Sequence, residues 1–536
     1  MSMKINETYI IKLPKPNMDG IMDVVLAKQH VFIRDGIENE KVEITITKRI
    51  KEGFIGKITR VIEPSKNRIV NPCPHTTCGG CSYNHMNYDA ECKLKCDQIK
   101  ELYKNEKIKV HPVTQAINSR EYRNKCIYTF QKVKKEIKFG FYEENSHRVI
   151  DIPNCLNHDE LTMKILKEIK KLVIKYKMEI FDEDKLTGIM RHVLIRRAFA
   201  TNQTLVCFVV ASDFKGSKNF VSSLMKQVPE ITTVVFNQNS RKTSVVLGDK
   251  EKVMYGKGYI VDELCGHTYK LSANTFYQIN HDQTERLYNK AIELCEFKGN
   301  EKVFDMYCGV GTIGMSCAHS VKEVIGVEIN TRSIQDAINN AKMNQVNNIQ
   351  FIAKDASTFM KDYAKKKEKV DVVIMDPPRS GSDIEFIRSC VSMNPKKVLY
   401  ISCHPLTQYR DLQTFRKFNY DTKEIYLFDL FPHSSHVETV VLLSRKKVND
   451  RINFDINIEA LPDRVSKTAT YAEIKAYVLE HYGLKVSSLY IAQIKDKHGI
   501  KERENYNIGE GKSKELICPP EKEEAITNAL KHFNMI

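Results

Sequence analysis

The sequence has no apolar run long enough to cross a membrane. A transmembrane helix needs about 18 or more consecutive apolar residues, and no such run occurs in the 536 residues. The first residues, MSMKINETYIIKLPKP, lack the apolar segment of a secretory signal. We also find no low-complexity tract and no internal repeat. These absences argue against a membrane-spanning or exported protein, and they predict a cytoplasmic one.

Cysteine, in contrast, is plentiful. The chain has 15 cysteines, and without export they are expected to remain reduced thiols rather than to form a disulfide framework. Each of them is therefore a candidate ligand, nucleophile or core residue.

The charge balance is strongly basic. Lysine and arginine number 83 against 67 aspartates and glutamates, which gives a formal net charge of +16. Such a surplus favours a polyanionic partner, with nucleic acid as the first choice and an anionic membrane surface as the second. A chain of this length predicts three or four domains.

The pattern along the chain divides it into four segments. In residues 1–62, the segments 24–36, 41–50 and 53–62 are β-branched and separated by turn residues, which predicts a small β-barrel. Residues 63–265 mix helices and strands as a central α+β domain. Residues 266–446 form the next domain, in which strands and helices alternate strictly from about residue 297. Residues 447–536 are patterned separately and predict an appended α/β module, with helices near 470–483 and 521–533.

Alternating strands and helices in 266–446 predict a doubly wound, Rossmann-like parallel sheet with ligands at the carboxyl ends of its strands. A glycine-rich turn containing Tyr307 and Gly309 follows the first strand, and Glu328 ends the second, where a carboxylate can bind ribose hydroxyls. These features alone fit NAD and S-adenosylmethionine equally.

Two later acids favour S-adenosylmethionine. Asp355 follows the third strand, at the expected place of an adenine amino group. Asp376 opens the sequence DPPR after the fourth strand, which resembles a motif that many methyltransferases place beside the transferred methyl. The alternative for Asp376 is a capping residue before a proline turn.

Cys403 ends the fifth strand, in SCHP. Cysteines in strands are usually packed residues, but one at a ligand-facing strand end is also a candidate nucleophile.

Five motifs in order, FYQIN, DMYCGVG, DPPR, SCHP and HSSHVE, resemble the RNA uridine-5-methyltransferases that act on ribosomal and transfer RNA. The resemblance runs from about residue 10 to 445. It implies that Cys403 adds to C6 of uracil, that C5 then takes the methyl of S-adenosylmethionine, and that Glu438 removes the C5 proton. It also implies cofactor contacts from Gln278, Tyr307, Glu328 and Asp376. For Glu438 the alternative is an ordinary charge at a strand edge.

The segment CPHTTCGGCSYNH holds three closely spaced cysteines, Cys73, Cys78 and Cys81. The spacing allows an iron–sulfur cluster, or zinc with His75 or His85 as a further ligand. The family resemblance favours a [4Fe–4S] cluster and implies Cys155 as its fourth ligand. Cys92 and Cys96 lie nearby in the sequence and are alternative candidates for the fourth ligand.

The resemblance also bears on partners. The N-terminal barrel resembles a TRAM domain, whose RNA contacts here could come from a group of basic and aromatic residues: Phe32, Arg34, Lys48, Arg49, Lys51 and Phe54. A monomeric enzyme acting on structured RNA is expected, with 23S ribosomal RNA preferred and transfer RNA as the alternative. A non-catalytic RNA-binding protein is the competing hypothesis.

Overall fold

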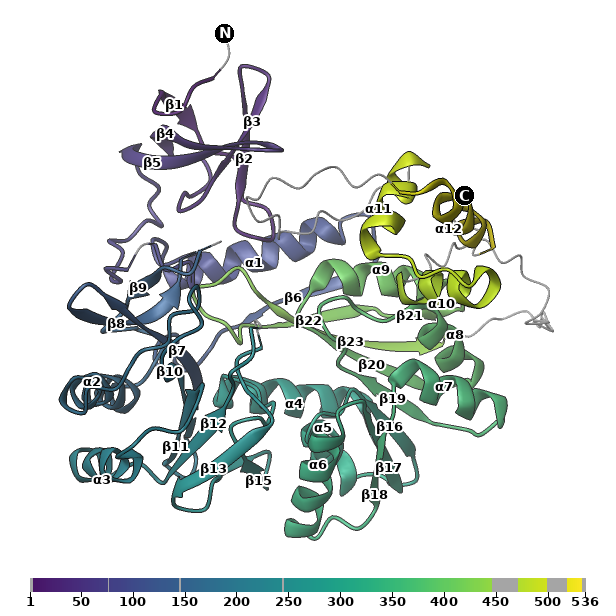
Figure 1. The fold of residues 1–536 in the computed structure, drawn as a ribbon. Coiled ribbons are helices and arrows are strands. Elements are labelled where there is room, and N and C mark those ends of the chain that lie inside the picture. The colour runs from purple at the N-terminus through teal and green to yellow at the C-terminus, as the bar shows by residue number, and fades with distance from the viewer. Residues whose placement is uncertain are drawn as a thin grey trace. The chain divides into compact units, whose positions relative to one another are not determined.

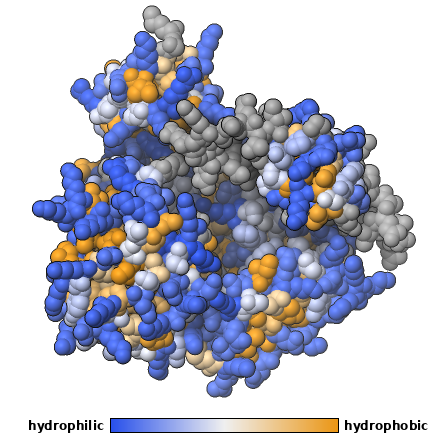
Figure 2. All heavy atoms as spheres, in the orientation of Figure 1, coloured by the Kyte–Doolittle hydropathy of each residue, from blue (hydrophilic) through white to orange (hydrophobic). Residues whose placement is uncertain are grey.

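The computed structural model describes residues 3–75, 77–143, 146–242, 245–445, 471–498 and 518–532 (Figure 1). The chain forms two compact units, Met1–Lys447 and Val448–Ile536. No helix among the described residues is both long and apolar enough to span a membrane. Hydrophilic residues predominate on the face of the molecule that Figure 2 presents.

The N-terminal part is a five-stranded sheet in the order β1-β4-β5-β3-β2. Its strands are β1 (Thr8–Lys12), β2 (Met22–Leu26), β3 (Gln29–Ile33), β4 (Lys41–Ile50) and β5 (Gly53–Glu63). Residues 24–36, expected as one strand, fold instead as a hairpin, because Ala27 and Lys28 both take positive φ in a tight turn. Phe54 is buried in the core of this sheet, so it is unavailable for stacking on RNA.

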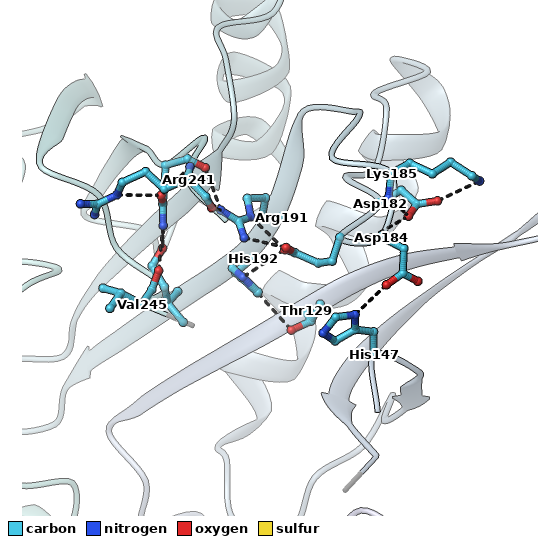
Figure 3. Close-up of polar contacts among 12 residues, drawn as sticks. Thr129, His147, Asp182, Asp184, Lys185, Arg191, His192, Arg241 and Val245 are labelled. Atoms are coloured by element: carbon cyan, nitrogen blue, oxygen red, sulfur yellow. Dashed lines mark hydrogen bonds and ion pairs between the residues drawn. The ribbon is translucent and has the colours of Figure 1, made fainter. Parts of the chain in front are cut away.

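The central part is a seven-stranded sheet in the order β13-β12-β11-β10-β7-β8-β9. Its strands are β7 (Lys125–Val133), β8 (Glu136–Tyr142), β9 (Val149–Asp151), β10 (Met190–Ala198), β11 (Gln203–Val210), β12 (Thr233–Gln238) and β13 (Lys250–Tyr255). Helices α2 (Glu160–Lys175) and α3 (Ser217–Gln227) pack their apolar stripes on it. Beside β10, Arg191 is buried and paired with Glu183, and it also donates to the Arg241 carbonyl (Figure 3).

The third part is a nine-stranded sheet, and it confirms the doubly wound α/β prediction. Along the sheet the order is β18-β17-β16-β19-β20-β23-β22-β6, with β21 paired to β23. The parallel strands are β16 (Lys302–Met306), β17 (Glu323–Glu328), β18 (Ile349–Ala353), β19 (Val372–Met375) and β20 (Lys397–Ser402). The remaining strands are β6 (Lys109–Thr114), β21 (Tyr420–Asp421), β22 (Glu424–Phe428) and β23 (Glu438–Arg445).

Helices cover both faces of this sheet, because successive strand residues point to opposite sides. One face packs against α4 (His281–Cys295), α5 (Thr312–Ala318) and α6 (Thr331–Met343). The other packs against α1 (Tyr88–Leu102), α7 (Ala356–Lys365), α8 (Ile384–Ser392) and α9 (Pro405–Arg416). The hairpin β14 (Ile260–Leu264) and β15 (His267–Leu271) precedes α4. Both α1 and β6 come from the N-terminal half of the chain, outside the 266–446 segment.

The second unit contains α10 (Tyr471–Tyr482), α11 (Ser488–Lys497) and α12 (Pro520–His532), packed on a core of their own. The helices expected near 470–483 and 521–533 are therefore confirmed. Residues 446–470 and 499–517 lie outside the described part of the chain.

Candidate active site

A glycine-rich turn joins β16 to α5 at the carboxyl edge of the parallel sheet. Tyr307, Gly309 and Gly311 all have positive φ in this turn. A Cβ atom on Gly311 would lie 2.7 Å from the ring of Phe351, whereas one on Gly309 would meet no atom within 4 Å. The turn therefore packs tightly on one side and leaves open space at Gly309, where a ligand can approach the backbone.

Glu328 and Asp355 lie at the ends of the two neighbouring strands. The Glu328 carboxylate accepts the N–H of Gly309 at 3.3 Å and that of Asn330 at 2.9 Å, so it is fixed beside the glycine turn. Asp355 is the N-cap of α7 and accepts the N–H of Thr358 at 2.8 Å through one oxygen. The adenine contact expected from the sequence would therefore be made by the other carboxylate oxygen of Asp355.

Asp376 follows β19 and lies between the glycine turn and the end of β20. Burial raises the pKa of its carboxyl to about 7. Its charge in turn raises the pKa of Asp305, at the turn, and those of Cys403 and Glu438. Among the described residues we find no hydrogen bond to the Asp376 carboxylate, so this side chain does not cap the proline turn that follows it.

Cys403 and Glu438 are brought together by strand pairing. β20 and β23 are antiparallel, and Ser402 is opposite Thr439. One residue further along each strand lie Cys403 and Glu438. The Thr439 hydroxyl donates to the Ser402 carbonyl at 3.1 Å, which ties the two strand ends together. Cys403 is partly exposed, whereas Glu438 is only 4% exposed.

The electrostatics of this pair follow from burial beside other acids. Burial, together with the charges of Glu438 and Asp376, raises the pKa of the Cys403 thiol to about 11. Burial and the Asp376 charge raise the pKa of Glu438 to about 8. Arg379 opposes both shifts. A buried carboxyl with a pKa near neutral is suited to proton transfer.

Two further groups at this site had no role assigned from the sequence. Arg379, the last residue of DPPR, donates to His436 Nε2 at 3.1 Å. Burial and the Arg379 charge lower the pKa of His436 to about 4, so its ring is a neutral acceptor. Arg379 belongs to the motif DPPR and His436 to the motif HSSHVE, but only the folded chain brings the two side chains together.

Gln278 lies in the segment between β15 and α4. The side-chain amide of Asn124, just before β7, donates to the Gln278 carbonyl at 2.8 Å, and the Asn124 N–H donates to Ile279. The FYQIN segment is thus anchored to the central sheet. Phe276 is 65% exposed, whereas Tyr277 is buried.

The cysteine segment lines a cavity of about 570 Å³ between the N-terminal sheet and the central sheet. Cys73, Cys78, Cys81 and Cys155 all line it, together with Arg120 and Arg123. Asn157 donates to the Cys81 sulfur at 3.3 Å, and the Gly80 N–H donates to the Cys78 sulfur at 3.4 Å.

The remaining candidate ligands are distributed differently. Cys92 and Cys96 are buried on α1 in the core of the nine-stranded sheet and do not line the cavity. His75 and His85 do line it. Within the described ranges, no group of three or more His, Cys, Asp or Glu side chains is arranged to hold a single metal ion.

Comparison with known proteins identifies the family. Residues 87–446 match the family model described as tRNA (Uracil-5-)-methyltransferase. An uncharacterized RNA methyltransferase of Staphylococcus aureus (strain N315) is 36% identical over 78% of this chain and 93% of its own length. One from Clostridium tetani is 35% identical over 82% and 97%.

The fold also matches a solved structure. The tRNA (uracil-54, C5)-methyltransferase of Pyrococcus abyssi, solved in complex with S-adenosyl-L-homocysteine, superposes with a TM-score of 0.66. It is 24% identical, and the match covers 81% of this chain and all of that one. The fold and the enzyme class expected from the motifs are confirmed. The chain belongs to the tRNA (uracil-5-)-methyltransferase family of class I S-adenosylmethionine-dependent RNA methyltransferases.

Proposed function

We propose that this enzyme methylates C5 of uridine in RNA through a covalent intermediate on Cys403. The observation that carries the proposal is the β20–β23 pairing, which brings a partly exposed cysteine beside a buried carboxyl. C5 of uracil is too weak a nucleophile to take a methyl group directly. A thiolate addition at the neighbouring carbon is the chemistry that this pair of residues suits.

The proposed steps conserve atoms and charge. The Cys403 thiolate forms a bond to C6, and the C5=C6 electron pair moves to give an enolate with nucleophilic C5. S-adenosylmethionine, when bound, supplies an electrophilic methyl group. After C5 is methylated, Glu438 takes the C5 proton, the C5=C6 bond re-forms, and the Cys403–C6 bond breaks to return the thiolate. Asp376 and Gln278 are proposed to line the space where base and methyl donor meet.

The methyl donor is proposed to bind along the glycine turn. The open space at Gly309 fits a ligand close to the backbone, and Glu328 is held beside it with its carboxylate oriented by two backbone N–H groups. Tyr307, at the start of the turn, is partly exposed and packs near Phe386. We propose Tyr307, Gly309, Glu328 and Asp355 as binding residues, with ribose hydroxyls on Glu328.

The covalent mechanism is tested with two variants and RNA carrying tritium at C5 of uridine. Cys403→Ala is expected to abolish both methyl transfer and tritium release, by more than about 1,000-fold. Glu438→Gln is expected to form the methylated adduct but to eliminate it slowly, so that a denaturation-resistant protein–RNA complex accumulates. Methylation by Cys403→Ala at the wild-type rate would refute the covalent route.

The four cavity cysteines are proposed to hold a [4Fe–4S] cluster. Support comes from their shared cavity, from the N–H groups directed at two of the sulfurs, and from the two arginines facing a group that would carry negative charge. Four cysteines are the ligand set that such a cluster takes. Nothing in the proposed reaction needs electron transfer, so its role would be structural. Anaerobic purification is expected to give a brown protein containing iron. Zinc without iron would contradict the proposal.

The RNA substrate is proposed to be 23S ribosomal RNA, since the resemblance in the cysteine segment and the N-terminal sheet is to ribosomal enzymes. Transfer RNA is the alternative, because the Pyrococcus abyssi enzyme is a tRNA methyltransferase. Mapping 5-methyluridine in all stable RNA of cells with and without the gene distinguishes them. Loss of the modification from transfer RNA alone would decide for the alternative.

A further inference from the structure

A buried group of charges joins α1 to the loop before the proposed base. Lys95 on α1 is fully buried, and its ammonium donates to Glu91 Oε1 and to Asp429 Oδ1, each at 2.8 Å. Glu91 and Asp429 are also fully buried. Asp429 begins the loop between β22 and β23, so the Lys95 ammonium bridges a helix from residues 88–102 to a loop more than 300 positions later.

The same group fixes the backbone of that loop, residues 429–437. Glu91 Oε1 accepts the backbone N–H of His433 at 2.7 Å. The His433 carbonyl accepts the N–H groups of Ser82 and Tyr83 at 2.8 and 3.1 Å. His433 has a φ of +64°, a conformation that a non-glycine residue keeps only when its surroundings impose it.

Two tyrosines complete the anchoring. The Tyr88 hydroxyl donates to Asp429 Oδ2 at 2.9 Å and accepts the N–H of Ala116 at 2.8 Å. The Tyr122 hydroxyl donates to the Pro432 carbonyl at 3.2 Å. Every one of these contacts comes from residues 82–122, and every one acts on the loop rather than on β22 or β23.

The loop ends at Glu438. Pairing with β20 begins at Thr439, whereas Glu438, the first residue of β23, is paired with Phe428 at the end of β22. Asp429 directly follows Phe428, so the contacts that hold Asp429 and the loop act at both chain ends next to Glu438. Moving a reacting group by about 1 Å can cost on the order of 100-fold in rate. Cys403 directly follows β20, and no hydrogen bond among the described residues joins it to this loop. A displaced loop would therefore impair proton removal while leaving the nucleophile in place.

Stability alone is a poor explanation for the group. Two carboxylates, one ammonium and the His433 ring, whose Nδ1 lies 3.2 Å from Glu91 Oε2, are enclosed away from water. Buried ion pairs are often no more stable than apolar replacements, and in some proteins they serve instead to fix one geometry.

We propose that Lys95, together with Glu91 and Asp429, is a positioning group that holds residues 429–437 so that Glu438 can take the C5 proton. The inference rests on the proposed function. It predicts that loss of Lys95 slows elimination more than methyl transfer.

The test uses full-length protein and in vitro transcribed 23S ribosomal RNA and transfer RNA, with methyl-labelled S-adenosylmethionine and C5-tritiated uridine. Lys95→Met is compared with wild type and with Arg191→Met. Arg191 is a buried cation on β10 of the central sheet (Figure 3), where it forms an ion pair with Glu183. The readout is the share of transferred methyl that remains in a denaturation-resistant protein–RNA adduct.

In Lys95→Met this share is expected to rise by roughly 10- to 100-fold, the scale of a misplaced catalytic group. In Arg191→Met it is expected to stay at the wild-type value, because destabilisation lowers adduct and product together. Tyr88→Phe removes one contact to Asp429 and is expected to give a smaller rise; it carries the test if Lys95→Met fails to fold.

If the wild-type enzyme is active but the share of methyl in the adduct is unchanged in both Lys95→Met and Tyr88→Phe, the positioning role is overturned and the proposed function stays intact. Wild-type protein that methylates neither RNA would instead refute the proposed function, and the inference would fall with it.

Discussion

At the scale of single residues, the proposed site combines the candidate nucleophile Cys403 with two acids, Asp376 and Glu438, whose own pKa values are raised to about 7 and about 8. Asp376 and Glu438 each raise the pKa of the Cys403 thiol, and Asp376 raises that of Glu438. The catalytic charges are therefore coupled, and changing one of them alters the others.

Proton removal should depend on pH through Glu438. The base must be ionised, and its pKa is raised to about 8, so release of methylated product is expected to increase with pH and level off above about 8. The stability of the fold is expected to change in the opposite direction. A carboxyl whose pKa is raised in the folded state contributes fully to the free energy of unfolding below its unfolded-state pKa, and this contribution is lost as the pH rises through about 8. Single-turnover rates and thermal unfolding over pH 6 to 9 check both. In Glu438→Gln the fall of stability with pH should be smaller.

The substitution Asp376→Asn removes the negative charge of this side chain while keeping a side chain of nearly the same shape at the same place. Removing the Asp376 charge is expected to lower the pKa of Glu438, which would move the pH profile of elimination to lower pH. Methyl transfer itself should fall if the carboxylate orients the base or the donor, as proposed. The pH profile of tritium release measures the shift. An unmoved profile would mean that the two acids are not coupled.

The places of most proposed site residues at strand ends could be predicted from the sequence, whereas their roles stay predictions. Cys403, Glu438 and Asp376 occupy one region of the sheet edge because they stand at such strand ends. The cap role of Asp355 and the Arg379–His436 bond could not be predicted. They depend on side-chain geometry that spacing does not carry.

At the scale of elements, the glycine turn between β16 and α5 allows little change. Gly311 combines a φ of +82° with a Cβ position 2.7 Å from Phe351, so Gly311→Val should distort the turn and weaken binding of S-adenosylmethionine by about 10-fold or more. Calorimetric titration measures this. Gly299→Val is a matched control, since Gly299 also has positive φ but open space around it. An equal loss of affinity for S-adenosylmethionine in both variants would indicate general backbone strain instead of the contact with Phe351.

Element prediction succeeded where strands and helices alternate, and it failed where a turn lacks typical turn residues or where the partner of a strand is distant in sequence. The alternation expected from about residue 297 is present as the strands β16 to β20 and the helices α5 to α9 that follow them in turn. The hairpin at residues 24–36 was missed because Ala27 and Lys28 are not typical turn residues. The membership of β6 in the nine-stranded sheet was also missed, because the sequence of one edge strand does not identify its partner.

At the scale of the whole molecule, the methyltransferase machinery lies in the unit Met1–Lys447. The match to the family model ends at residue 446, so it does not include the second unit. A chain ending at residue 447 is therefore expected to keep single-turnover methyl transfer within about 2-fold of the full protein, since no proposed site residue is removed. Methylation assays and thermal unfolding of both chains check this. A loss of activity greater than about 10-fold would assign the second unit a direct part in catalysis.

The pairing of β6 with β22 has a consequence for synthesis on the ribosome. Lys109 is opposite Glu424, so β6 leaves the ribosome roughly 300 residues before its partner. At about 5 to 20 residues per second, this interval lasts about 15 to 60 s. During that time the strand and the buried face of α1 cannot complete their packing, because the part of the sheet that covers them does not yet exist. The nascent chain should consequently depend on chaperones until the last strands appear, even though most of its sheet can form in order.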